Sequence, residues 1–134
     1  MNPRKCFIDT DAYSVYTAGD PRLRRIFDGR TEFIIPLVVI GELRGGFAAG
    51  KYQTHNERLL QRFLDQPNVT SCSLSEGTTK LYGQIYAKLR AAGKPIGTND
   101  MWIAALCLER NLPLLTLDKH FSAIPNLELI EIQK

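Results

Sequence analysis

A short run near the start of the chain decides the fold: Lys5-Cys6-Phe7-Ile8-Asp9. Its apolar residues predict a buried strand, and the strand ends on a carboxylate, which is costly to bury unless it is paired or bound to a metal. The run LLTLD at residues 114–118 repeats this arrangement near the end of the chain. Because ligands bind at the carboxyl ends of the strands in open α/β sheets, Asp9 and Asp118 are candidates for a functional site.

Apolar and polar residues alternate in blocks that predict strands and helices in turn. Ile85 and Leu89 recur at helical spacing between Ser75, which can cap a helix, and Gly93, which can end one. Asn99 can cap the following helix in the same way. This order of elements predicts an α/β fold with a mostly parallel sheet. The predicted strands cover residues 5–8, 32–35, 69–72, 114–117 and 127–132, and the helical segments cover residues 11–28, 38–49, 54–64, 75–92 and 100–110.

The length and composition are those of one globular domain. The chain has 134 residues, of which 44% are hydrophobic and 23% charged, so it can bury a core of its own. No stretch approaches the roughly 20 apolar residues that a membrane span needs. The basic Arg4 and Lys5 are followed by only a short apolar run, far less than a signal peptide needs. We therefore expect a cytoplasmic protein that does not enter a membrane.

The cysteines and the net charge carry little functional information. Cys6, Cys72 and Cys107 are odd in number and have no metal-binding spacing, so we expect inert, mostly buried thiols. The formal net charge of +3 is compatible with a polyanionic partner, but it is too small to identify a nuclease.

Glu42 and Asp100 are two further isolated acids beside Asp9 and Asp118. Glu42 is the only charged residue in the segment 36–43, and Asp100 opens a predicted helix. Each acid could have an ordinary role, as a surface residue, a partner of a helix dipole or a turn former. Together, the four would lie at one edge of a parallel sheet, where an oxygen-rich cluster suits Mg²⁺ or Mn²⁺.

Four short motifs, in this order, resemble those of PIN-domain nucleases, most closely the VapC-type toxins of bacterial and archaeal toxin–antitoxin pairs. The resemblance spans nearly the whole chain. It departs at Asp11, where the family usually has Asn. Asp11 could hold a metal together with Asp9 or cap the following helix, and we favour a cap or a place outside the ligand shell. The motifs are FIDTD at residues 7–11, GELRGG at 41–46, NDMWIA at 99–104 and LTLDKHF at 115–121.

The resemblance implies a fold, an activity and a site. The fold would be a PIN-like, three-layer α/β/α domain with a mostly parallel central sheet, forming a single nuclease domain over residues 1–134. The activity would be Mg²⁺- or Mn²⁺-dependent hydrolysis of RNA phosphodiester bonds by an endoribonuclease, the toxin of a type II toxin–antitoxin system. Its partners would be RNA, a cognate antitoxin and a second copy in a homodimer. The catalytic and metal-binding residues would be Asp9, Glu42, Asp100 and Asp118, with Thr116 as an auxiliary hydroxyl.

One or two divalent ions on these carboxylates would position and deprotonate a water for in-line attack on a phosphodiester. Basic residues would contact the RNA phosphates, which positions a strand without selecting its bases. We interpret His120 as structural, because nothing further supports a pair with His55 for acid–base chemistry. The candidates for phosphate contact are Arg22, Arg24, Arg25, Lys51, Lys94 and Lys119.

Two other functions fit parts of the sequence. The segment 9–11 also resembles the nucleophile motif of haloacid-dehalogenase-type phosphatases, in which Asp9 would attack phosphorus and Asp11 would act as acid and base. Tyr13 departs from that motif, and no paired-acid motif follows late in the chain. A module that binds RNA or a protein without cutting has no need for four repelling acids. We expect three apolar residues to lie in the core, with a partner groove as the alternative: Phe47, Met101 and Trp102.

Overall fold

The computed structural model describes residues 4–26 and 30–132, without the side chains of residues 24–26 and 131. Strands and helices alternate as the sequence predicts, and most boundaries agree within two residues. The elements, in chain order, are β1 (Lys5–Ile8), α1 (Thr10–Thr17), α2 (Pro21–Ile26), β2 (Glu32–Pro36), α3 (Leu37–Ala49), α4 (Gln53–Leu64), β3 (Val69–Cys72), α5 (Glu76–Ala91), α6 (Thr98–Arg110), β4 (Leu114–Thr116), the 3-10 helix η1 (Lys119–Ala123) and β5 (Leu129–Glu131).

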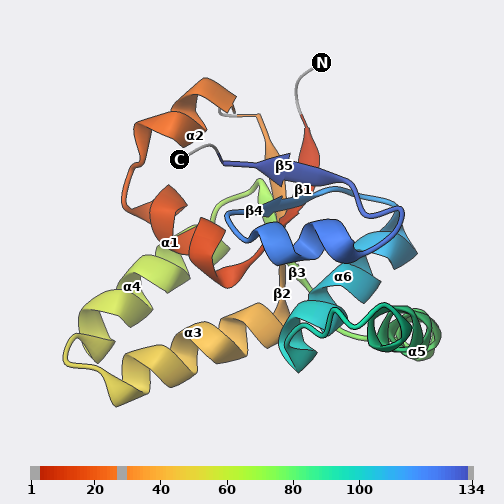
Figure 1. Ribbon diagram of the computed structural model, residues 1–134. Helices are drawn as coiled ribbons and strands as arrows, with labels where there is room; N and C mark the ends of the chain where they lie inside the picture. The colour runs from red at the N-terminus through yellow and green to blue at the C-terminus, as the bar shows by residue number, and fades with distance from the viewer. Residues whose placement is uncertain (1–3, 27–29, 133–134) are drawn as a thin grey trace.

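The five strands form one sheet in the order β3-β2-β1-β4-β5, and every pair is parallel. The predicted α/β fold with a mostly parallel central sheet is confirmed. In Figure 1, α1 and α4 lie on one side of the strands and α5 and α6 on the other, which gives the three layers. The strand order reverses between β1 and β4, so the crevice between their carboxyl ends is the expected ligand site. Asp9 follows β1, and Asp118 lies two residues after β4.

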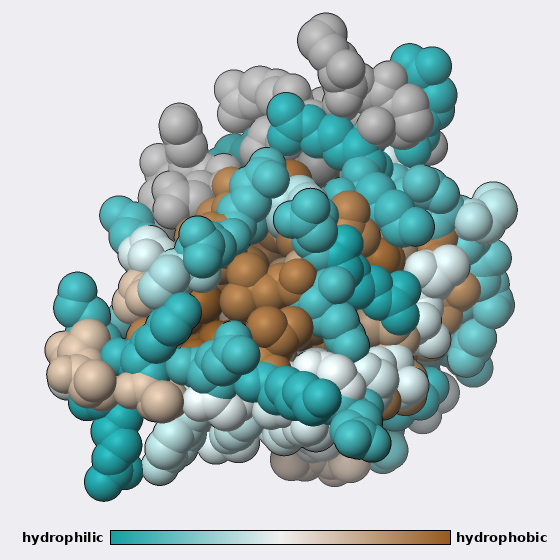
Figure 2. Space-filling model, turned by 90° about the vertical axis from the view of Figure 1, so that its right-hand side faces the viewer, coloured by the Kyte–Doolittle hydropathy of each residue, from teal (hydrophilic) through white to brown (hydrophobic). Residues whose placement is uncertain are grey.

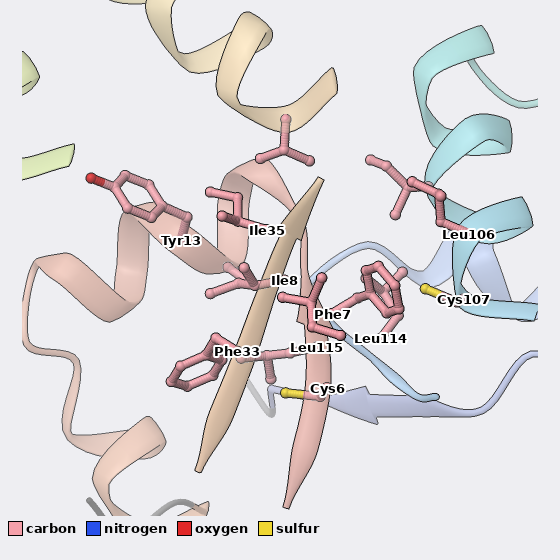
Figure 3. Packing of buried hydrophobic residues seen from close by; sticks show 14 of the residues in the cluster. Cys6, Phe7, Ile8, Tyr13, Phe33, Ile35, Leu106, Cys107, Leu114 and Leu115 are labelled. Carbon is pink, nitrogen blue, oxygen red and sulfur yellow. The ribbon is translucent and has the colours of Figure 1, made fainter. Parts of the chain in front are cut away.

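The central strands are buried on both faces, which explains their continuous apolar runs. All three residues of β4 are buried, and Cys6, Phe7 and Ile8 in β1 are fully inaccessible. Figure 3 shows Tyr13 and Phe33 on one side of the strands and Leu106 and Cys107 on the other. All three cysteines are buried and free, as predicted.

Two predicted helix caps are wrong, because the backbone begins each helix earlier than the polar residue suggests. The cap before α1 is Asp9, whose side chain accepts a hydrogen bond from the backbone of Ala12, so Asp11 lies inside the first turn. The cap before α6 is Gly97, without a side-chain bond, and Asn99 lies within the helix. Capping needs the extended backbone of the residue just before the first turn, and sequence polarity locates that residue only to within a position or two.

The predicted cap of α5 is confirmed and is part of a larger network. Ser75 and Thr78 form a capping box, in which the Ser75 side chain accepts from the Thr78 backbone and the Thr78 side chain accepts from the Ser75 backbone. The carboxylate of Glu109 on α6 accepts hydrogen bonds from both hydroxyls, at 2.6 Å from Ser75 and 2.5 Å from Thr78. This network ties the start of α5 to the end of α6, the two helices on that side of the sheet.

Two glycines of α5 test the contribution of this network. A Cβ on Gly77 would lie 2.8 Å from Glu109 Oε2, so alanine there must displace the carboxylate, whereas a Cβ on Gly83 would meet no atom within 4 Å. Gly83→Ala should stabilise the protein by up to about 1 kcal/mol through helix propensity. Gly77→Ala should lose that gain and about 1 kcal/mol more from the broken hydrogen bonds. Urea unfolding checks both variants, and equal stabilities would contradict the structural importance of the Glu109 network.

Of the three residues expected in the core, Met101 is buried, and Phe47 and Trp102 are partly buried. Met101 is 6% exposed and belongs to the core, as predicted. Phe47 is half-buried against the core, and the Trp102 ring stacks on Tyr82 with ring centres 3.9 Å apart.

Figure 2 shows a hydrophobic area ringed by hydrophilic residues on the face that lies to the right in Figure 1, the side of α5 and α6. None of the helices among the described residues is long and apolar enough to span a bilayer.

Candidate active site

Asp9 is the most buried acid of the chain that the structure describes, with 6% of its surface exposed. Both oxygens of its carboxylate accept hydrogen bonds, Oδ1 from Ala12 N at 2.9 Å and Oδ2 from the Thr116 hydroxyl at 2.5 Å. Burial raises the pKa of Asp9 from 3.8 to about 6, against the lowering effect of these two hydrogen bonds. The negative charges of Asp11 and Asp100 raise it further.

Thr116 joins the two strand-end aspartates. It is the last residue of β4, it is 1% exposed, and its hydroxyl donates to Asp9 while accepting from Asp118 N at 2.9 Å. The carboxylate of Asp118 in turn caps η1 by accepting from His120 N at 2.8 Å. This chain of bonds fixes Asp9 and Asp118 relative to each other just beyond the ends of the neighbouring strands β1 and β4, where the strand order reverses.

Glu42 approaches the same place from α3. Pro36 ends β2, and α3 begins at the next residue. Glu42 therefore lies on the second turn of α3. The Glu42 carboxylate accepts a hydrogen bond of 3.0 Å from the hydroxyl of Thr10. Thr10 is the residue directly after Asp9 in the chain. Sequence reasoning missed this contact of Thr10, since a hydroxyl in the first turn of a helix has no distinctive pattern.

Asp100 is coupled to the other acids by charge. It lies half-buried in the first turn of α6. Burial raises its pKa, and the charges of Asp118, Glu42 and Asp11 raise it further, while His120 opposes the shift. Within the described residues, neither Asp9, Glu42 nor Asp100 forms an ion pair with a basic side chain. The structure thus brings all four predicted acids together, and Asp11 with them.

The donor set fits a hard divalent cation. Carboxylate and hydroxyl oxygens are the ligands that Mg²⁺ and Mn²⁺ prefer, and the mutual repulsion of the acids would be relieved by a positive ion between them. As their side chains stand, no three Asp, Glu, His or Cys residues of the described part are arranged to hold a metal. The oxygens of Asp9 are already oriented by Thr116 and Ala12, whereas Glu42 and Asp118 are more exposed.

His120, which the sequence suggested as structural, lies against an acid of the cluster. Its Nδ1 atom is 3.0 Å from Asp118 Oδ1, and its side chain is 83% exposed. Among the basic residues considered for phosphate contact, Arg22 is paired with Asp20 at 2.5 Å, and Lys51 lies in the turn beyond the far end of α3. The side chains of Arg24 and Arg25 lie outside the described residues.

Thr116 offers a direct test of the bond between the two strands. Thr116→Val removes the hydroxyl, so Asp9 loses a donor and Asp118 N loses an acceptor at a buried position, which should cost about 1–3 kcal/mol of folding free energy. It should also weaken Mn²⁺ binding, because the Asp9 carboxylate is then no longer oriented. Thr116→Ser keeps the hydroxyl and should restore the Mn²⁺ affinity. Calorimetric titration measures both variants, and equal affinities for valine and serine would contradict the role of the hydroxyl.

The fold is that of a known class of proteins. The PIN domain family model matches residues 6–127. The chain is similar to Ribonuclease VapC4 of Mycobacterium tuberculosis (strain ATCC 25618 / H37Rv), with 29% identity over 134 residues that cover 98% of this chain and all of the relative. It is also similar to Ribonuclease VapC2 of Rickettsia felis, with 33% identity over 96 residues, 71% of this chain and 70% of the relative.

Solved structures show the same fold. VapBC2 from Rickettsia felis, bound to a DNA fragment from its promoter, matches with a TM-score of 0.84 and 25% identity over 96% of this chain and 99% of that chain. DNA-bound VapBC from Salmonella typhimurium matches in fold, with a TM-score of 0.84 and 22% identity over 98% and 100% of the two chains. This protein therefore belongs to the PIN-domain family and, within it, to the VapC ribonucleases.

Proposed function

We propose that this protein is a metal-dependent endoribonuclease that hydrolyses RNA phosphodiester bonds as the toxin of a type II toxin–antitoxin pair. The observation that carries the proposal is the convergence of Asp9, Glu42, Asp100 and Asp118 at the switch point of the sheet, in a chain that belongs to the VapC ribonucleases. The nuclease domain would span residues 1–134, and its substrate would place its action in the cytoplasm.

The four carboxylates are the proposed holders of Mg²⁺ or Mn²⁺. When bound, such an ion would supply an activated water and stabilise negative charge on the transferring phosphoryl group. Asp9, Asp100 and Asp118 would be the main ligands, since they come from the strand ends and from the first turn of α6. Glu42 comes from α3 and accepts a hydrogen bond from Thr10, and its carboxylate would complete the shell or orient the attacking water.

Thr116 would act as a positioning residue rather than as a reacting group. Its hydroxyl is already committed to Asp9 and to the backbone of Asp118, so it fixes two ligands relative to each other. Asp9 in turn caps α1, which orients its carboxylate through Ala12. Groups held in this way need no reorganisation when substrate arrives, and this lowers the barrier of the chemical step.

The proposed partners are an antitoxin and a second copy of the chain. The similar structure from Rickettsia felis is VapBC2 bound to promoter DNA, which supports an antitoxin partner for this protein too. The hydrophobic area in Figure 2 supports a protein interface, because large exposed apolar areas mark such surfaces. The homodimer can be tested by light scattering of the purified chain.

The activity can be tested with cellular RNA. Purified protein would be refolded from denaturant to remove any bound inhibitor and then incubated with total RNA in Mg²⁺, in Mn²⁺ or in EDTA. We expect discrete new RNA ends in either metal and intact RNA in EDTA. Cleavage that continues at the same rate in EDTA would contradict the metal dependence, and an aspartyl-phosphate trapped on Asp9 would favour a phosphatase instead.

A further inference from the structure

A hollow of about 460 Å³ lies beside the acidic cluster, between the loop that follows α5 and the 3-10 helix η1. Both of its walls continue into the candidate active site. Lys119 directly follows Asp118, and the loop leads through Gly97 to Asp100, whose Oδ2 lies 3.7 Å from the place where a Cβ on Gly97 would stand. Its lining residues are Gly93, Lys94, Pro95, Ile96, Lys119, His120, Ser122 and Ala123.

The charges on this lining are opposite in sign to those of the neighbouring cluster. Lys94 and Lys119 are both exposed, and neither has an ion-pair partner among the residues that the structure describes. His120 adds a third nitrogen-bearing side chain, and none of the described residues that line the hollow is acidic. The hollow therefore offers positive charges directly beside the carboxylate cluster. This arrangement suits a chain of anionic groups in which one group lies in the hollow and the next lies at the acids.

The backbone holds the two lysines on facing walls. Gly93 adopts a left-handed backbone conformation, with φ at 67°, and Lys94 N donates to Leu89 O at 2.9 Å, which ends α5 and turns the chain into the loop. On the other wall, the Ser122 hydroxyl donates to Lys119 O at 2.7 Å and closes the turn of η1. The positions of both lysines are therefore set by ordered turns, although their side chains remain free to reach a ligand.

We propose that this hollow binds a backbone phosphate of single-stranded RNA next to the bond that is cut, with Lys94 and Lys119 as the phosphate-contacting residues. The inference rests on the proposed function, since it concerns the path of the same RNA. Four clustered carboxylates repel a polyanion, so the strand needs cations close to the site to remain bound there. Of the basic residues considered from the sequence, these two are the ones that line this hollow.

Binding can be separated from cleavage in the Asp100→Asn background. In that background, the affinity for a single-stranded RNA oligonucleotide would be measured by fluorescence anisotropy over a range of salt concentrations. Adding Lys94→Gln and Lys119→Gln should weaken binding by about tenfold. The magnitude of the slope of log K against log salt should fall by about 0.7, which is the value for the loss of one single-strand phosphate contact. Lys80→Gln with Lys88→Gln, two exposed lysines of α5 outside the hollow, is the control with equal loss of charge.

The control pair should lower affinity only slightly and leave the salt slope nearly unchanged. Equal losses in the two double variants would overturn the hollow as a phosphate site, because only the net charge would then matter. The test does not depend on catalysis. If wild-type protein cuts no RNA, yet the hollow variant alone loses affinity, the proposed function fails and the binding site stands.

Discussion

Asp100→Asn is expected to lower the rate of RNA cleavage by about a thousandfold while the protein stays folded. Asparagine has nearly the shape of aspartate, and α6 begins two residues earlier at Thr98, so the helix is retained. The lost charge removes a metal ligand, and about 4 kcal/mol of transition-state stabilisation, a typical share for a metal ion, corresponds to that factor. The same change removes the repulsion from Asp118 and Glu42, so the metal-free variant should melt at a higher temperature than wild type.

Initial rates on a labelled RNA and melting curves in EDTA measure the two effects together. Asp65→Asn, at an exposed carboxylate after the end of α4, is the matched control and should change neither quantity much. An Asp100 variant that cleaves nearly as fast as wild type would remove Asp100 from the site. A variant that cleaves slowly but also melts at a lower temperature would indicate misfolding instead of a lost ligand.

The stability of the metal-free protein should depend on pH through Asp9. Its pKa is about 6 in the folded protein and 3.8 in an ordinary environment, so the native state binds more protons than the unfolded state between these values. The resulting stabilisation is complete below about pH 4 and is lost as the pH rises through 6. At about 1.4 kcal/mol for each pKa unit, the loss amounts to about 3 kcal/mol.

Comparison with Asp9→Asn isolates this effect from other titrating groups. Asparagine carries no titrating proton, so the difference in unfolding free energy between wild type and the variant should shift by about 2 kcal/mol from pH 4 to pH 7, in favour of the variant. Urea unfolding in EDTA at each pH measures it. Parallel curves for the two proteins would mean that Asp9 is not perturbed. Saturating Mn²⁺ should reverse the order at pH 7, because only the wild type retains the buried ligand.

Most of the fold could be predicted because local signals and tertiary needs agree. The runs at 5–8 and 69–72 are strands with the predicted bounds. The apolar residues of 5–8 suit a central strand covered on both sides, whereas 69–72 is an edge strand whose two middle residues are exposed. The 3-10 helix η1 was not predicted, because its five residues have no apolar period long enough to detect. The strand order also required the structure, since it depends on crossovers that a single sequence does not encode locally.

The site was predictable in its acids but not in the bonds that organise them. Isolated acids after apolar strands are visible in the sequence, and parallel strands bring such residues to one edge. Asp9 is both the cap of α1 and an acid of the cluster. This double role depends on the extended backbone of Asp9 between β1 and α1, and residue types alone do not reveal it. The bond from Thr10 to Glu42 joins residues 32 positions apart, and no local pattern predicts it.

The central claim is that one cation-binding cluster of acids cuts RNA, and a paired Mn²⁺ titration tests it most directly. On one preparation freed of bound inhibitor, Mn²⁺ binding would be measured by calorimetry and RNA cleavage by initial rates, over the same concentrations. We predict that both curves reach half-saturation together, and that Asp100→Asn loses both. RNA that is cut without bound Mn²⁺, or that stays intact when Mn²⁺ saturates the wild-type protein, would contradict the account.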